Sequence, residues 1–382
     1  MEAPNYFAET LGRQHPLYVV RVSTILDESF TEIRKHEVLR KEGLLVEYAD
    51  DDPHPVLFCS HTWLRRSAPD NSQHVKLTLL KSVLRRAVEG SLGNLSPHWL
   101  TALAYKEASA ALHLQADDLR KLKDGYVFFD YMSIPQEDRE AQGRAIASLV
   151  SYVSSSAYFM CLAGPWTHED FGDARDDLAW SGRGWCRMEL LCNLLSPQAK
   201  PLIVIQSSSD VRSHGPAGLF GRNWIISPVG RGEFTVEADR VALGPVIERL
   251  IDERMAAKRQ EGTEAALRWY RFLHAHKASL LLGTGIKVTP YDTLEEVIGL
   301  RGRTDDGLRG TLIDLGVSYG QVDLTADGDF DLAAIDAAIT PETAMVHVQR
   351  SCGYAWRPSI CLLYTSDAAD DTPCVDLGGR RI

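Results

Sequence analysis

One carboxylate of this chain stands inside an otherwise apolar segment. Glu189 belongs to residues 185–191, Trp-Cys-Arg-Met-Glu-Leu-Leu, whose apolar positions three and four apart form one stripe in a helix. A carboxylate beside a buried stripe is costly unless it has a partner, a water or a chemical task. Two interpretations stay open: Glu189 pairs with Arg183, Arg187 or another basic group, or it serves a reaction.

Other polar side chains stand directly after short apolar runs. They are Ser60 with His61, Asp130, and the segment 207–210. Apolar runs this short are typical of strands that are covered on both faces. Because active sites of parallel α/β sheets lie at the carboxyl ends of the strands, these groups are expected at one edge of the sheet.

Two residues of this set have a structural and a chemical interpretation. His61 is a candidate base, but its position favours a hydrogen-bonded structural histidine at a strand end. Cys186 is a candidate nucleophile, yet its neighbours predict a small buried thiol without a histidine partner. The sequence predicts no metal site, because the cysteines show no paired spacing.

The elements that must position these residues alternate between strands and helices. Strands are expected at 17–22, 56–59, 126–129, 157–162 and 202–205, and helices at 75–88, 97–114, 142–153 and 185–195. This alternation predicts an α/β fold with a mainly parallel sheet flanked by helices on both faces. A long helical stretch follows, from Leu243 to about Lys277, and its charges are expected to form a solvated face.

Composition narrows the classes of partner and location. The 382 residues carry a net charge of −11 and no basic stripe with interleaved aromatics, which predicts no nucleic-acid partner. No apolar run approaches the length needed to cross a bilayer, and none follows the N-terminus as a signal peptide would, so we expect no membrane partner. Seven scattered cysteines predict reduced thiols and a cytoplasmic protein.

Four motifs between residues 50 and 215 resemble TIR-like domains, and in particular fungal HET domains. In chain order they are Val-Leu-Phe-Cys-Ser-His-Thr-Trp at 56–63, Phe-Phe-Asp-Tyr-Met-Ser-Ile-Pro-Gln at 128–136, Trp-Cys-Arg-Met-Glu-Leu at 185–190, and the strand and Asp-Val-Arg turn at 201–212. The resemblance implies a TIR/HET-like, flavodoxin-like domain over residues 1–240. Residues 64–125 form a helical insertion longer than is usual between the first two motifs.

The resemblance also implies a function. In enzymatically active TIR domains, the glutamate at the position of Glu189 promotes cleavage of NAD at the nicotinamide glycosidic bond. Ser60, His61, Asp130 and Trp185 are then expected to bind the substrate. NAD would be a substrate, no cofactor would be required, and the domain would signal or recognise itself by self-association. Many TIR relatives only associate, so a non-catalytic α/β adaptor is an alternative.

The C-terminal part has a different resemblance. After a helical linker at 241–284, residues 285–360 resemble the methionine gamma-lyase-like (aluminium-resistance) family of pyridoxal-phosphate (PLP) enzymes, with landmarks at 289–299, 322–335 and 349–359. Tyr291 matches the aromatic residue that stacks on the PLP ring. The alternative function is therefore a PLP-dependent carbon–sulfur lyase. This piece is predicted to be inactive, because the cofactor needs a lysine and none follows Lys287.

The last residues have the pattern of translated DNA adapters. Residues 361–370 can be encoded by transposase-type sequencing-adapter DNA, and residues 374–382 by the flow-cell adapter that follows it in the same frame. We therefore expect 361–382 to be an artefactual, disordered tail. By the same logic, the join near residues 278–290 is predicted to be a chimera.

Overall fold

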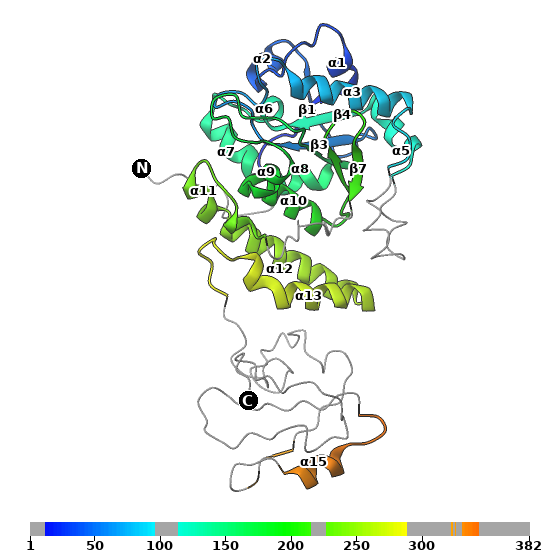
Figure 1. Ribbon diagram of the computed structural model, residues 1–382, viewed down its shortest axis with the longest axis vertical. Coiled ribbons are helices and arrows are strands. Elements are labelled where there is room, and N and C mark those ends of the chain that lie inside the picture. Colours follow the sequence, from blue (N-terminus) through cyan, green and yellow to red (C-terminus); the bar gives the residue numbers. More distant parts are fainter. Residues whose placement is uncertain are drawn as a thin grey trace. The chain divides into compact units, whose positions relative to one another are not determined.

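The computed structural model describes residues 12–95, 114–214, 227–288, 322–323, 325 and 331–343. The chain divides into two compact units, Met1–Thr311 (unit 1) and Leu312–Ile382 (unit 2). Figure 1 shows the strands and most of the helices in unit 1. Tyr291, the expected tail 361–382 and most of the expected helix 97–114 lie outside the described residues.

A seven-stranded mixed sheet forms the centre of the described part of unit 1. Its order is β2-β1-β4-β3-β5-β6-β7. The strands are β1 (Tyr18–Arg21), β2 (Leu45–Glu47), β3 (Val56–His61), β4 (Tyr126–Phe129), β5 (Tyr158–Leu162), β6 (Leu202–Ile205) and β7 (Val211–His214). Strands β4, β3, β5 and β6 are parallel, whereas β1, β2 and β7 add antiparallel edges. The expected α/β fold with a mainly parallel sheet is confirmed.

The strand order creates a switch point next to β3. The chain passes from β3 to β4 on one side of it and then returns to β5 on the other side. In open α/β sheets the crevice outside the carboxyl ends of the strands at such a point is the usual ligand site. Ser60 and His61 end β3 and pair in register with Cys161 and Leu162 of β5.

Helices cover both faces of the sheet (Figure 1). The first part of unit 1 contains α1 (Val22–Leu26), α2 (His36–Lys41), α3 (Val75–Glu89), α5 (Ala116–Arg120), the 3₁₀ turn η2 (Lys121–Asp124) and α6 (Asp130–Ser133). The rest contains α7 (Arg139–Ala147), α8 (Leu149–Ser155), α9 (Asp177–Gly182), α10 (Gly184–Leu195), η3 (Val229–Arg231), α11 (Glu237–Ala242), α12 (Gly244–Glu261) and α13 (Glu264–Leu280).

Alternation along the strands divides the core into two. Leu57 and Cys59 of β3 belong to the cluster that includes the apolar face of α3, whereas Phe58 belongs to the cluster that includes α8 and α10. Successive side chains of a strand point to opposite faces. Ser60 therefore points to the α10 side and His61 to the α3 side, and this single difference decides the partners of both residues.

Helices α12 and α13 replace the single long helix that the sequence predicts over 243–277. Gly262 ends α12 with φ +67°, a left-handed conformation that favours glycine, and Thr263 begins the next helix by accepting a hydrogen bond from the Ala266 amide at 3.2 Å. Both helices contribute buried residues to the cluster that holds α10. The second expected helix that divides is 142–153, which becomes α7 and α8 around Ser148.

Replacing Thr263 by Ala is expected to lower the free energy of unfolding by about 1 kcal/mol, because the first turn of α13 loses its side-chain cap. Chemical denaturation measures this difference. Thr78→Ala, on an exposed position of α3, is the matched control and should change stability by less than about 0.5 kcal/mol. Equal stabilities of the two variants would show that the cap contributes nothing.

The described part of unit 2 contains one helix, α15 (Leu332–Ala338). Asp331 caps it by accepting a hydrogen bond from the Ala334 amide at 2.9 Å. Across the described ranges of both units, no helix combines the length and the apolar character that crossing a bilayer requires.

Candidate functional site

Ser60 is the point where β3 meets α10. Its hydroxyl donates a hydrogen bond to Oε2 of Glu189 and accepts one from the indole Nε1 of Trp180 at 2.8 Å. Ser60 and Trp180 are almost completely buried, whereas Glu189 is partly exposed. Ser60 of β3, itself held by Trp180 of α9, thus fixes the carboxylate of Glu189 from α10 at the carboxyl end of the sheet, beside the switch point. We call Ser60 and Glu189 the serine–glutamate pair.

The carboxyl group of Glu189 is protonated far more readily than a free glutamate. Burial raises its pKa to about 8, the Ser60 hydrogen bond opposes this shift, and the nearby charge of Asp130 adds to it. The two arginines that sequence reasoning offered as partners bind elsewhere. Arg183 donates to Thr235 at 2.6 Å, and Arg187 donates to the carbonyls of Ser181 and Pro228. The interpretation of an ion pair with either arginine is therefore wrong.

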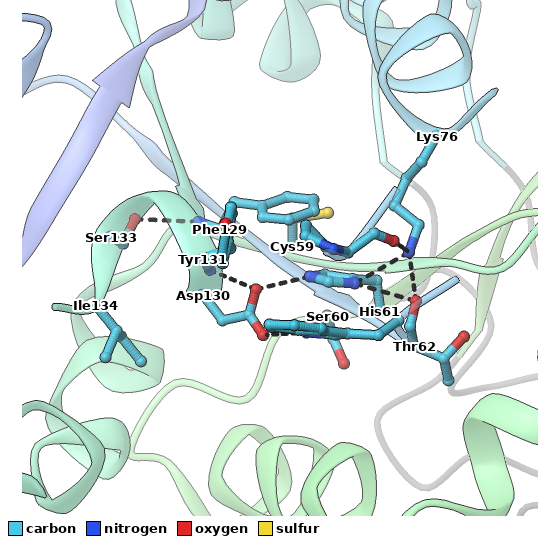
Figure 2. A network of polar contacts seen from close by, with 12 residues as sticks. Cys59, Ser60, His61, Thr62, Lys76, Phe129, Asp130, Tyr131, Ser133 and Ile134 are labelled. Atoms are coloured by element: carbon cyan, nitrogen blue, oxygen red, sulfur yellow. Dashed lines mark hydrogen bonds and ion pairs between the residues drawn. The ribbon is translucent and has the colours of Figure 1, made fainter. Parts of the chain in front are cut away.

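His61 lies in a second polar cluster, on the α3 side of the sheet (Figure 2). Its Nε2 is 2.8 Å from Oδ1 of Asp130, and its Nδ1 is 3.1 Å from Nζ of Lys76. An ammonium group can only donate, so Nδ1 accepts and the proton of the neutral ring is on Nε2, which donates to Asp130. Burial lowers the pKa of His61, although Asp130 opposes this, and the ring stacks on Phe129 at 4.0 Å.

The residue that sequence reasoning missed is Lys76. It is completely buried, and its ammonium group also donates to the carbonyls of Thr62 and Pro69, the latter at 2.8 Å. Burial lowers its pKa to about 8, while Asp70 and Asp130 act in the opposite direction. The available signal was a lysine on the apolar face of the predicted helix 75–88, where a solvated charge does not belong.

Asp130 connects this buried chain to the surface. Burial disfavours its charge, but the attraction and hydrogen bond of His61, with the bonds from Trp63 and the Tyr131 amide, outweigh that effect and lower its pKa. The Trp63 indole donates to Oδ2 at 3.2 Å, and its ring meets the Tyr131 ring edge-on at 5.5 Å. Both rings are partly exposed. The chain Lys76–His61–Asp130 therefore orients an aromatic pair at the sheet edge, and both nitrogens of His61 are occupied.

The structure brings together some of the predicted residues and separates others. Ser60 is hydrogen-bonded to Glu189, and His61 is hydrogen-bonded to Asp130. Trp185 points elsewhere: its indole donates to Asp239 of α11 at 3.0 Å. Cys186 is buried and donates to the carbonyl of His61 at 3.5 Å, and burial raises the pKa of its thiol far above the usual range, which fits an inert thiol.

The segment 207–210 forms a turn. Asp210 pairs with Arg212 at 2.6 Å in the hairpin between β6 and β7. Among the residues that the structure describes, no group of three histidine, cysteine or acidic side chains is arranged to hold a metal ion.

One family model matches the C-terminal part of the chain. Residues 264–369 match the family model of methionine gamma-lyase. The chain is also similar to the uncharacterized protein YnbB of Bacillus subtilis (strain 168), with 49% identity over 73 residues, which are 19% of this chain and 17% of that protein. The chain thus covers about a sixth of the relative's length. No solved structure matches the chain.

These matches bear out one resemblance and leave the other as a prediction. The resemblance of the C-terminal part to methionine gamma-lyase is confirmed by the family match, which begins at the start of α13, earlier than the expected residue 285. It also extends into the first residues of segment 361–382. Nothing in the matches supports a TIR or HET domain, because the family match begins after the four motifs that carry that resemblance.

The residues present do not fit a covalently bound PLP. The cofactor is held through a lysine amine, and no lysine follows Lys287 in the sequence. Tyr291, the expected stacking residue, lies outside the described residues. The side chains of this sequence therefore support no chemical step through PLP.

Proposed function

We propose that unit 1 binds NAD at the carboxyl edge of its sheet and hydrolyses the nicotinamide glycosidic bond. One observation carries the proposal: the serine–glutamate pair places a partly exposed carboxylate beside the switch point of the sheet. The motifs that resemble TIR/HET domains support it, since the position of Glu189 is catalytic in active TIR domains. The partly exposed rings of Trp63 and Tyr131, at the same end of the sheet, offer apolar surface to an aromatic ring of the substrate.

The chemistry suits a carboxylate. Nicotinamide leaves C1′ of the ribose as a neutral molecule and takes the bonding electron pair, so the departure needs no acid. The ribose develops oxocarbenium character, which the negative charge of Glu189 stabilises. Water then attacks C1′ and loses a proton, giving ADP-ribose and nicotinamide. Ser60 and Trp180 keep the carboxylate in place during these steps.

The pH dependence of this reaction follows from the state of Glu189. The ionised carboxylate is the active form, and its pKa of about 8 leaves it mostly protonated at pH 7. We expect kcat/KM to rise about tenfold per pH unit between pH 6 and 8 and to level off above pH 9. The cationic nicotinamide of bound NAD favours the ionised form, so kcat should level off at lower pH.

The test is NAD consumption by the full chain, measured across this pH range and at low and high protein concentration. The concentrated sample addresses the self-association expected of TIR-like domains. A flat or falling profile would contradict the assignment of Glu189. No consumption at any concentration would leave the adaptor function, in which the same domain only associates.

A second candidate function rests on the family match over residues 264–369. It is a PLP-dependent lyase activity, which needs a lysine for the cofactor, whereas no lysine follows Lys287 in this sequence. After incubation with pyridoxal phosphate and desalting, we expect no retained visible absorbance band. A retained band with lyase activity would favour this second function over NAD hydrolysis.

A further inference from the structure

A cavity of about 520 Å³ lies beside α9 and α10 in unit 1. Trp180 is shared between this cavity and the serine–glutamate pair: it lines the cavity and donates to Ser60. Ser60 and Glu189 themselves do not line it. The cavity is therefore separate from the serine–glutamate pair, and its volume suits a small organic molecule.

Much of the cavity wall is apolar. Trp180, Leu190 and Leu191 line it from α9 and α10, and Val229 and Leu280 add to the lining from η3 and α13. All five of these side chains belong to one buried core cluster of unit 1, which fixes their positions. A preformed apolar wall of this kind takes the flat or aliphatic body of a ligand at little cost in conformational entropy.

Arg187 brings a positive charge to the lining of the cavity. Its side chain is half-buried on α10, and its Nε and Nη1 donate to the carbonyls of Ser181 and Pro228 at 2.7 and 3.0 Å. Burial lowers its pKa, and Glu233 acts in the opposite direction. Carbonyls orient the guanidinium but leave its charge in place, and across the described ranges it forms no ion pair.

The acidic side chains that line the cavity have partners within the protein. Asp173 pairs with Arg175 at 2.8 Å, and Asp176 accepts the Ala179 amide at the start of α9. Glu233 is largely exposed and lies 4.0 Å from Arg183. These carboxylates would repel a strongly charged anion, whereas a single negative charge is balanced by Arg187.

We propose that this cavity binds a small monoanion, with its carboxylate on Arg187 and its apolar body against Trp180 and Leu191. The site is separate from the proposed NAD reaction, and its binding can be measured without any turnover. Because Trp180 contacts both places, a bound molecule would lie one side chain away from Ser60.

The test uses 2-naphthoate as the probe and 2-naphthamide as its neutral counterpart, with calorimetry on the full chain. Naphthoate should bind at least about tenfold more tightly than the amide, the size of one charge-assisted bidentate contact. Arg187→Gln should remove this preference. Arg183→Gln is the matched control, because Arg183 lies next to the cavity without lining it, and it should bind as the wild type does.

A second variant protects the test against misfolding of Arg187→Gln. Gly182 lines the cavity, and a Cβ at this position would meet no heavy atom within 4 Å. Gly182→Leu should fold and fill the space, which abolishes binding of both probes. Equal affinity for the two probes, or unchanged naphthoate binding in both Arg187→Gln and Gly182→Leu, would overturn the proposal.

Discussion

Glu189→Gln is expected to lower the rate of NAD hydrolysis by about 10²- to 10³-fold, because an amide keeps the shape of the carboxylate but cannot carry the charge that stabilises the ribosyl cation. The hydrogen bond with Ser60 can persist in the variant, so the local packing should be retained. Initial rates of NAD loss at pH 9, where the wild-type carboxylate is ionised, measure the difference. Asp210→Asn, at the same sheet edge, is the matched control and should retain full activity.

The same variant has a second signature in its stability. The pKa of Glu189 is raised from 4.5 to about 8 in the folded chain, so the folded state holds its proton more firmly than the unfolded state between these values. Stability therefore falls as pH rises through that window. Glu189→Gln removes this loss and should melt at a higher temperature than the wild type at pH 9. A variant that loses both activity and stability would point to a structural carboxylate.

Lys76→Met is expected to lower the free energy of unfolding by about 3 kcal/mol or more. Methionine fills nearly the same space but leaves the Thr62 and Pro69 carbonyls and the Nδ1 of His61 without the ammonium donor. Each buried acceptor left without a partner costs about 1–3 kcal/mol. Urea denaturation at pH 7.5 measures the loss.

Lys81→Met on the same helix is the matched control. Lys81 is partly exposed, and the hydrogen bond that it donates to the carbonyl of Asp27 lies at the surface, so its replacement should change stability by less than about 0.5 kcal/mol. Removing Lys76 also removes a charge that lowers the pKa of His61. His61 should then accept a proton more readily beside Asp130, and the deficit of Lys76→Met should shrink at acid pH. A deficit that is small and independent of pH would contradict the role given to Lys76.

Sequence patterns predicted the parallel core well, because each of its strands contains a run of at least four apolar residues. The runs 126–129 and 202–205 coincide with β4 and β6. The edge strands β2 and β7 were not expected, since each is three or four residues long with mixed polarity and depends on pairing with a neighbour already in place. The break at Gly262 was missed although glycine followed by threonine is a common end-and-start signal for helices.

The candidate site was predicted in part. Order along the chain identified Ser60, His61, Asp130 and Glu189, but it did not show that Ser60 and His61 belong to separate clusters. Strand alternation contains that information once β3 is known to have a helix on each face. The partners Trp180 and Lys76 come from α9 and α3, and no spacing in the sequence links them to β3.

The core of unit 1 contains cysteines whose reactivity can report local unfolding of the sheet and α10. Cys59 and Cys161 lie in central strands, and Cys186 and Cys192 lie in α10; all four are buried, reduced thiols. A soluble thiol reagent reaches them only in molecules whose sheet and α10 have separated. The rate of labelling at these four positions therefore measures how often the serine–glutamate pair comes apart, without any engineered cysteine.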